Sequence, residues 1–227
     1  MMGGFRRISA LVLFAAILAG CAGVPFKSAE KAEIPAGDPW AVCSVFGGKN
    51  PDKFSLLNTI EFNYGWFSRM SAIGAIELDG PGDRFVAACF TPLGIKLFEV
   101  GYSAGKLEPR YVFKQLAEKG DVARAVGEDI KKIYFDMLPA PGAAVKAGKY
   151  SLVFEGKRGD GVIRHIFAGP GANLVEKCFY GANGRLSWKV SYYEYETVNG
   201  KVFPGGIVLE NVKYGYTLTV RLKKVNE

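Results

Sequence analysis

The chain has few of the residues from which most catalytic and metal sites are built. Its 227 residues include one histidine, four cysteines and four methionines. The sequence contains no phosphate-binding loop, no HExxH motif and no paired-cysteine ligand set. It therefore predicts no cofactor and no metal site.

Long apolar runs are also scarce. The one long run covers about twelve residues, 8–19, whereas a helix needs roughly twenty to cross a bilayer. This excludes a polytopic membrane protein, and we expect most of the chain to be water-soluble. With 49% hydrophobic and 22% charged residues it can bury one core, and 29 glycines, 11 prolines and 13% aromatic residues favour a β-rich fold.

The first twenty residues are predicted to be a targeting segment. They have a basic start, the apolar run and then the sequence Leu-Ala-Gly, which leads directly into Cys21. This pattern resembles the bacterial lipoprotein signal, which implies cleavage before Cys21 and acylation of that residue. An ordinary cleaved signal ending near Ala22 is the alternative. Lipoproteins held at the inner membrane typically carry Asp after the cysteine, so Ala22 favours the outer membrane.

After the cysteine the residues are mostly Ala, Gly, Pro, Lys and Glu up to Pro39, without an apolar period. We predict a flexible tether that, with the acylated cysteine, covers residues 21–53, and a domain over residues 54–227. As a coil, eighteen residues span roughly 25 Å. The net charge of +7 suits anionic lipid headgroups better than nucleic acid, which an exported protein does not routinely meet.

Period-two alternation predicts an antiparallel sheet. It is clearest where Tyr216, Leu218, Val220 and Leu222 share one side of a strand. Short turns rich in Gly, Pro and Asn connect the segments, which favours antiparallel order. The other strands are expected at residues 73–79, 84–91, 94–103, 106–113, 149–155, 162–168, 173–180, 185–197 and 206–212.

Residues 114–138 break this pattern, because their apolar side chains recur at helical spacing. They predict a short helix closed by Gly120 and then an amphipathic helix capped by Asp121. A pair between Glu128 and Lys132 should support that helix, and Pro139 should stop it.

Gly101-Tyr102-Ser103-Ala104-Gly105 matches the GxSxG pattern of serine hydrolases. That nucleophile needs a strand leading into a helix, whereas the following residues predict a return strand, so we interpret the motif as a hairpin. In the hydrolase alternative His165 would be the base, oriented by Asp129 or Asp136. We predict no enzymatic activity. Cys89 and Cys178 stand in similar settings, and whether they pair stays open.

Two segments resemble LolB-type outer-membrane lipoprotein receptors. The first is TPLGIKLFEV at residues 91–100, followed by a hairpin, a short and a longer helix and Leu-Pro at residues 138–139. The second is RLSWKVSY at residues 185–192, followed by Val-Phe-Pro at residues 202–204 and two closing strands. The chain also resembles uncharacterised outer-membrane lipoproteins of the same superfamily.

The resemblance implies a LolA/LolB-like fold, a curled antiparallel sheet forming an incomplete barrel with a helical lid over an apolar cavity. It implies binding of acyl chains and help in receiving or inserting lipoproteins at the outer membrane, with a periplasmic LolA-type carrier as partner. We expect a monomer. The alternative is a non-enzymatic structural or accessory lipoprotein of the same fold.

The resemblance also implies site residues. In the turn Pro92-Leu93-Gly94, Leu93 would enter the bilayer; folding back onto Phe98 or a helix is the alternative. The candidate cavity residues are apolar, and each of them could instead be plain core. They are Ile76, Leu78, Phe90, Leu97, Ile130, Ile133, Tyr134, Met137 and Trp188.

Overall fold

The structure is a computed structural model that describes residues 24–65, 68–118 and 120–226. The predicted signal peptide and the predicted lipidation site Cys21 lie outside the described residues. Among the described residues, no helix is long and apolar enough to cross a membrane.

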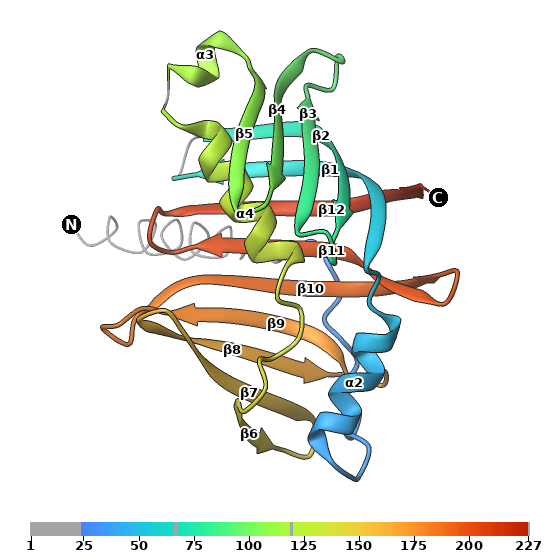
Figure 1. The fold of residues 1–227 in the computed structure, drawn as a ribbon. Coiled ribbons are helices and arrows are strands. Elements are labelled where there is room, and N and C mark those ends of the chain that lie inside the picture. The colour runs from blue at the N-terminus through green and yellow to red at the C-terminus, as the bar shows by residue number, and fades with distance from the viewer. Residues whose placement is uncertain (1–23, 66–67, 119, 227) are drawn as a thin grey trace, which may run out of the picture.

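One open sheet of twelve antiparallel strands forms the body of the protein (Figure 1). Its spatial order is β5-β4-β3-β2-β1-β12-β11-β10-β9-β8-β7-β6, and the two ends do not pair with each other. The predicted curled antiparallel sheet is therefore confirmed. The strands are β1 (Lys53–Tyr64), β2 (Ser68–Asp79), β3 (Arg84–Phe90), β4 (Lys96–Ser103), β5 (Lys106–Val112), β6 (Ala144–Ala147), β7 (Ser151–Arg158), β8 (Gly161–Ala168), β9 (Asn173–Tyr180), β10 (Leu186–Val198), β11 (Lys201–Asn211) and β12 (Tyr216–Asn226).

The predicted helical insertion is present as α3 (Lys114–Ala117) and α4 (Val122–Tyr134). The expected stop at Pro139 is wrong, because α4 already ends at Tyr134. Asp121 caps α4, because its side chain accepts the Arg124 N–H. The expected pairing of Glu128 with Lys132 is wrong. Lys132 instead bonds Asp129 at 2.6 Å, while Glu128 pairs with Arg124.

The prediction of a flexible tether up to residue 53 is wrong over residues 39–49, which form a third helix, α2 (Pro39–Lys49). Asp38 caps it by accepting the Trp40 N–H, and Pro39 takes the first helical position, where its missing N–H costs nothing. Cys43 and Phe46 of α2 are buried. The helix escaped prediction because its apolar residues are not confined to one face.

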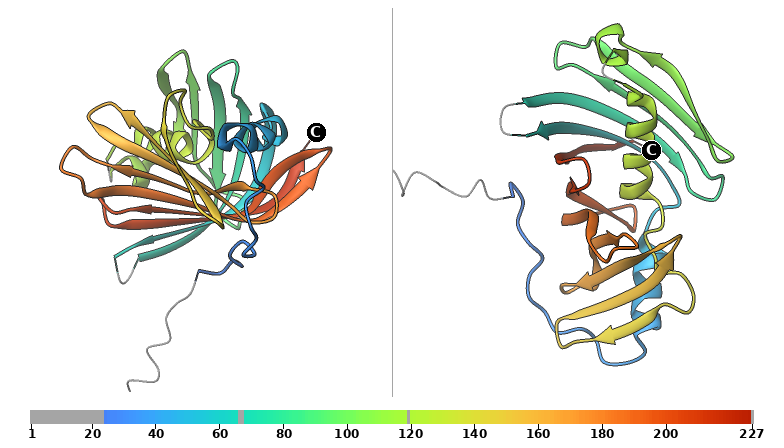
Figure 2. Two further views of the ribbon diagram at one scale, coloured as in Figure 1. Left: turned by 90° about the horizontal axis from the view of Figure 1, so that it is seen from below. Right: turned by 90° about the vertical axis from the view of Figure 1, so that its left-hand side faces the viewer.

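The stretch before α2 also contacts the domain. Phe26 is 8% exposed, and the Ile34 N–H bonds the Lys149 carbonyl at 2.9 Å. In Figure 2 this segment runs along the outer face of the sheet before it turns into α2. The predicted flexible coil is therefore docked from residue 25 to residue 34.

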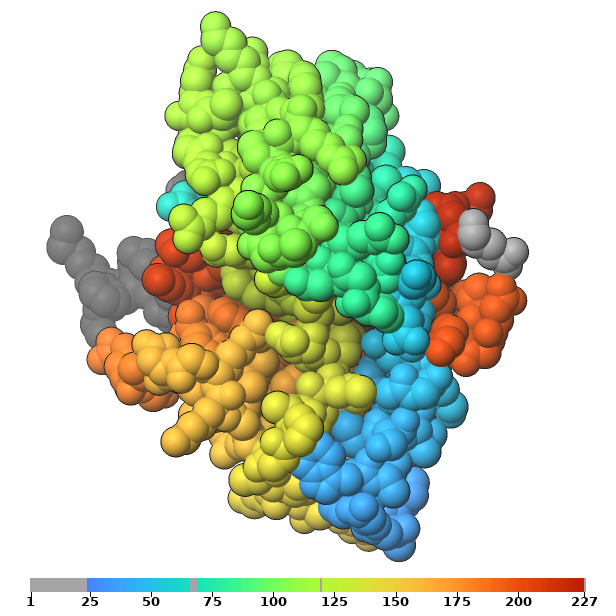
Figure 3. Space-filling model, viewed as in Figure 1, coloured from blue at the N-terminus to red at the C-terminus, as the bar shows by residue number. Residues whose placement is uncertain are grey.

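The concave face carries two apolar clusters. One lies between α2 and β7–β12 and is filled by aromatic rings, with Phe46 and Phe154 both set edge-on against Phe167. The other lies between α4 and β1–β4. In the space-filling view α4 and the segment after it occupy the seam between the two halves of the sheet (Figure 3). Cys43, Cys89 and Cys178 are buried free thiols, so Cys89 and Cys178 do not pair.

A candidate functional site in the cavity under α4

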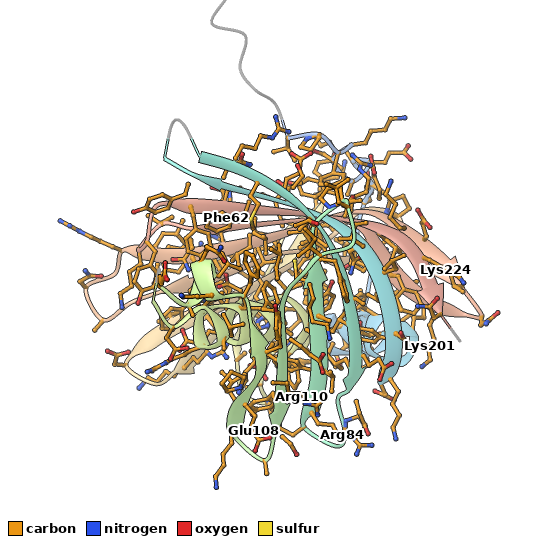
Figure 4. All side chains as sticks on the ribbon, turned by 90° about the horizontal axis from the view of Figure 1, so that it is seen from above. Phe62, Arg84, Glu108, Arg110, Lys201 and Lys224 are labelled. Atoms are coloured by element: carbon orange, nitrogen blue, oxygen red, sulfur yellow. The ribbon has the colours of Figure 1, made fainter. Side chains whose placement is uncertain are left out.

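An apolar cavity of about 280 Å³ lies between α4 and strands β1, β2, β3 and β12. Figure 4 draws the side chains on the ribbon and labels one of the lining residues, Phe62 of β1. Its wall is almost entirely hydrocarbon. The lining residues are Asn58, Ile60, Phe62, Met70, Ala72, Gly74, Ala75, Ile76, Ala87, Ala88, Cys89, Phe98, Leu116, Val122, Ala125, Val126, Asp129, Ile130, Ile133, Tyr134, Tyr216, Leu218 and Val220.

The hollow arises from small residues on β2 and β3. Ala72, Gly74 and Ala87 lie on the side of the sheet that α4 covers, and two methyl groups and a bare glycine leave space beneath the helix. A Cβ on Gly74 would lie 2.4 Å from Ile60 Cδ1, so only glycine leaves room for Ile60 at this position.

Helix α4 presents one apolar face to this hollow. Val122, Val126, Ile130 and Ile133 follow the helical period and line the cavity. Arg124 and Glu128 lie on the opposite, exposed side. The helix is therefore a cover with a hydrocarbon underside.

The few polar groups in the cavity wall have partners. Asp129 accepts a 2.6 Å hydrogen bond from the Tyr216 hydroxyl and another from Lys132. Burial raises the pKa of the Asp129 carboxyl although Lys132 opposes the shift. Burial also raises the pKa of Tyr134, whose hydroxyl bonds Asn58. No buried side-chain N or O of the described lining residues lacks a hydrogen-bond partner, so the cavity favours an apolar ligand.

The volume limits what can bind. A cavity of about 150 Å³ holds one benzene molecule, so at the same density 280 Å³ holds about ten carbon atoms. One acyl chain fits over most of its length, and a second does not fit beside it. A ligand with several chains would need α4 to move.

Four of the nine predicted cavity residues line the cavity: Ile76, Ile130, Ile133 and Tyr134. They come from β2 and α4. Their helical or alternating spacing gave the correct face in each case.

The other five predicted residues do not line it. Leu78 and Leu97 are buried in the cluster between α4 and β1–β4 but away from the cavity. Met137 and Trp188 belong to the cluster under α2, because Met137 lies beyond the end of α4 and Trp188 stacks on Phe179. Phe90 alternates with the buried Cys89 and so faces the other side of the sheet.

Strand β1 is the main contribution that the sequence analysis missed. Asn58, Ile60 and Phe62 line the cavity from this strand. Their signal was present, because they alternate with the polar residues Thr59 and Glu61.

The turn between β3 and β4 projects Leu93 into solvent, with 89% of its surface exposed. The Gly94 N–H bonds the Thr91 carbonyl at 2.9 Å, and the Ile95 N–H bonds Thr91 Oγ1 at 3.1 Å. Gly94 has a φ of +84°, which favours glycine. The alternative in which Leu93 folds back onto Phe98 or a helix is therefore wrong.

The GxSxG motif lies in the β4–β5 hairpin, as predicted. Ser103 is exposed and pairs with Lys106 across the turn. His165 is buried on β8, where its Nε2 contacts the Asp136 carbonyl oxygen at 2.9 Å. The turn leads into a return strand, so the strand-to-helix elbow that such a nucleophile requires is not formed at this motif.

Comparison with known proteins gives a fold. No family model and no curated protein sequence matches the chain. Among solved structures, a LolA superfamily protein from Nitrosomonas europaea superposes with a TM-score of 0.56 at 14% identity, covering 84% of this chain and 94% of that one. A domain of an outer membrane lipoprotein-sorting protein from Vibrio parahaemolyticus gives a TM-score of 0.49 at 10% identity, covering 82% of this chain and 90% of that one. The chain therefore has a LolA-like fold.

Proposed function

We propose that this protein is a lipid-anchored carrier that binds acyl chains in the cavity under α4 and helps receive or insert lipoproteins at the outer membrane. The observation that carries the proposal is the cavity itself, a hollow with a hydrocarbon wall and no unpartnered buried side-chain polar atom among its described lining residues. A chain of about ten carbons buried there would gain roughly 8 kcal/mol at about 0.8 kcal/mol per methylene. The likeness in fold to a LolA superfamily protein supports the same class of ligand.

Leu93 supplies a second support. A fully exposed leucine at a turn tip is unfavourable in water, and burial in a bilayer would gain about 1.5–3 kcal/mol. Ile95 in the same connection is 52% exposed and adds apolar surface. We propose that Pro92, Leu93 and Gly94 form a membrane-insertion loop that aids delivery of the acyl chain.

The proposed anchor is Cys21, acylated after removal of residues 1–20, with residues 54–227 as the main lipid-binding unit. Triacylation would hold the protein at a membrane, because two anchoring signals already suffice for stable attachment. The proposed partners are lipoprotein acyl chains, the outer membrane and a periplasmic LolA-type carrier. Neither enzymatic chemistry nor nucleic acid enters this proposal.

Filling the cavity tests the proposal. We expect the purified protein to bind an apolar fluorophore that an acylated peptide displaces. Ala72→Phe and Ala87→Phe place a ring in the hollow and should weaken this binding at least tenfold. Ala144→Phe, on the exposed strand β6, is the matched control and should bind normally. Equal binding by all variants would show that the fluorophore does not occupy this cavity, and absent binding by the unsubstituted protein would favour the accessory lipoprotein without a bound lipid.

A further inference from the structure

The segment before α2 has a built site for one aromatic ring. Tyr193, Gly206 and Arg221 are direct neighbours across β10, β11 and β12 on the outer face of the sheet. Phe26 lies over this row, stacked on Tyr193 with ring centroids 5.5 Å apart and with the Arg221 guanidinium 4.4 Å from its own centroid. We call these three residues, together with Glu194, the Phe26 seat.

Glycine is required at the centre of the seat. A Cβ on Gly206 would lie 2.3 Å from the Phe26 ring, closer than van der Waals contact allows. The Phe26 ring therefore occupies the space that a side chain at position 206 would need. Phe26 retains only 8% of its exposed surface there.

Two side chains hold the backbone on either side of the ring. Arg221 Nη2 donates to the Pro25 carbonyl at 2.9 Å, and the Lys27 N–H donates to Glu194 Oε1 at 2.9 Å. Each of these two hydrogen bonds has one charged partner, and such bonds are stronger than those between neutral groups. The ring and the two bonds together fix residues 25–27 on the sheet.

A second contact between this segment and the domain lies further along the chain. Lys149 pairs with Glu33 at 2.9 Å, and its carbonyl accepts the Ile34 N–H. Lys149 lies just before β7, so this contact is separate from the Phe26 seat. It offers an internal reference for any test of the seat.

We infer that the Phe26 seat is a clamp that shortens the membrane tether, so that the outer face of β10–β12 stays close to the lipid surface. The inference rests on the proposed anchorage through Cys21. Five residues lead from Cys21 to Phe26, and they reach at most about 18 Å when extended. A free tether running to Pro39 would instead hold the domain at a variable distance of roughly 25 Å.

The charges on the outer face of the sheet indicate what sets its distance from the bilayer. Around the seat Arg221 is paired with Glu194, and Lys189 with Glu210, so positive and negative groups alternate. Such a face has little net attraction for anionic headgroups. The clamp and the anchor, and not the lipid charge, should set the distance from the bilayer.

The test uses the chain from Cys21 to Glu227, which contains every described residue. Its Cys21 thiol is coupled to maleimide lipids in supported bilayers of phosphatidylethanolamine, with or without phosphatidylglycerol, and Cys43, Cys89 and Cys178 are protected by burial. Neutron reflectometry then measures the water layer between headgroups and protein. Amide hydrogen exchange reports on Lys27 and Ile34.

We expect the unsubstituted chain to lie close to the headgroups, with the same thin water layer at either lipid composition. Phe26→Ala and Gly206→Ala should both widen the water layer and lower the protection of the Lys27 amide about tenfold, while Ile34 stays protected. Phe26→Ala acts on the segment alone and leaves the sheet intact. Lys223→Gln, an exposed change on β12, should behave like the unsubstituted chain.

An unchanged water layer and unchanged Lys27 exchange in Phe26→Ala would overturn the inference. So would a distance that follows the phosphatidylglycerol content. The proposed function is tested separately by fluorophore binding to the soluble protein. Absent binding would contradict the proposed function, whatever the thickness of the water layer under the lipid-coupled chain.

Discussion

The Tyr216 hydroxyl of β12 donates a hydrogen bond of 2.6 Å to Asp129 Oδ2 of α4, and so joins the cover of the cavity to its floor. Asn211 donates to the same hydroxyl at 2.8 Å, which holds the ring in place. Lys132 bonds the other carboxylate oxygen. This network is one of several polar links between α4 and the sheet, and it lies beside the cavity, so it should contribute to how readily α4 lifts.

Tyr216→Phe should loosen the cover without changing the volume of the ring. It removes one hydrogen bond from a buried carboxylate, so we expect a loss of about 1–3 kcal/mol in the free energy of unfolding and several-fold faster release of a bound apolar fluorophore. Urea unfolding and stopped-flow dissociation measure the two effects. Tyr214→Phe, at an exposed ring two residues away, is the control, and equal release rates in the two variants would contradict the role of this bond.

Leu93→Glu should separate binding from delivery. The side chain does not line the cavity and is 89% exposed, so we expect normal fluorophore binding and normal stability. Transfer of an acylated cargo to vesicles should fall several-fold, because a carboxylate does not enter hydrocarbon. Val145→Glu, at an apolar residue of β6 that is 36% exposed, is the control and should transfer normally. Unimpaired transfer by Leu93→Glu would remove the membrane-insertion loop from the proposal.

Acid should destabilise the protein through His165. Burial lowers the pKa of His165 from 6.5 to about 4, with Lys177 and Arg158 adding to the shift and the contacts to Asp136 opposing it. Between these two pH values the unfolded chain binds a proton that the folded chain does not, so the free energy of unfolding falls as the pH falls from 6.5 to 4. The full effect is about 3 kcal/mol.

Urea unfolding at several pH values measures this slope. The same slope in His165→Gln should be smaller, because glutamine does not titrate. The comparison between the two proteins removes the contribution of Asp129, whose raised pKa acts in the opposite direction. Identical slopes in both proteins would show that His165 is not the source.

Cys89 provides a label inside the cavity that needs no substitution. Its thiol lines the wall, and burial raises its pKa to about 11. We expect a bound acyl chain to slow alkylation of Cys89 several-fold and to leave Cys43 and Cys178, buried outside the cavity, unaffected. Peptide mass spectrometry follows all three in one sample. Equal slowing at all three cysteines would indicate general stabilisation and not occupancy of the cavity.

The sequence alone determined the fold class and the position of α4. Alternation in β12 and the helical period from Val122 to Ile133 are local patterns, set by which side chains must be buried on one face. The turn that exposes Leu93 was also predictable, because Pro92 and Gly94 suit their positions in a tight turn.

Only the tertiary structure decided which apolar residues surround a hollow and which fill a core. Leu78 and Trp188 have the same periodicity as Ile76, yet the cavity forms only where Ala72, Gly74 and Ala87 from neighbouring strands meet under α4. The docking of Phe26 was equally hidden, because its slot is built from three strands brought together by pairing across the sheet. Periodicity records burial along one segment, whereas empty space and long-range seats depend on how separate segments meet.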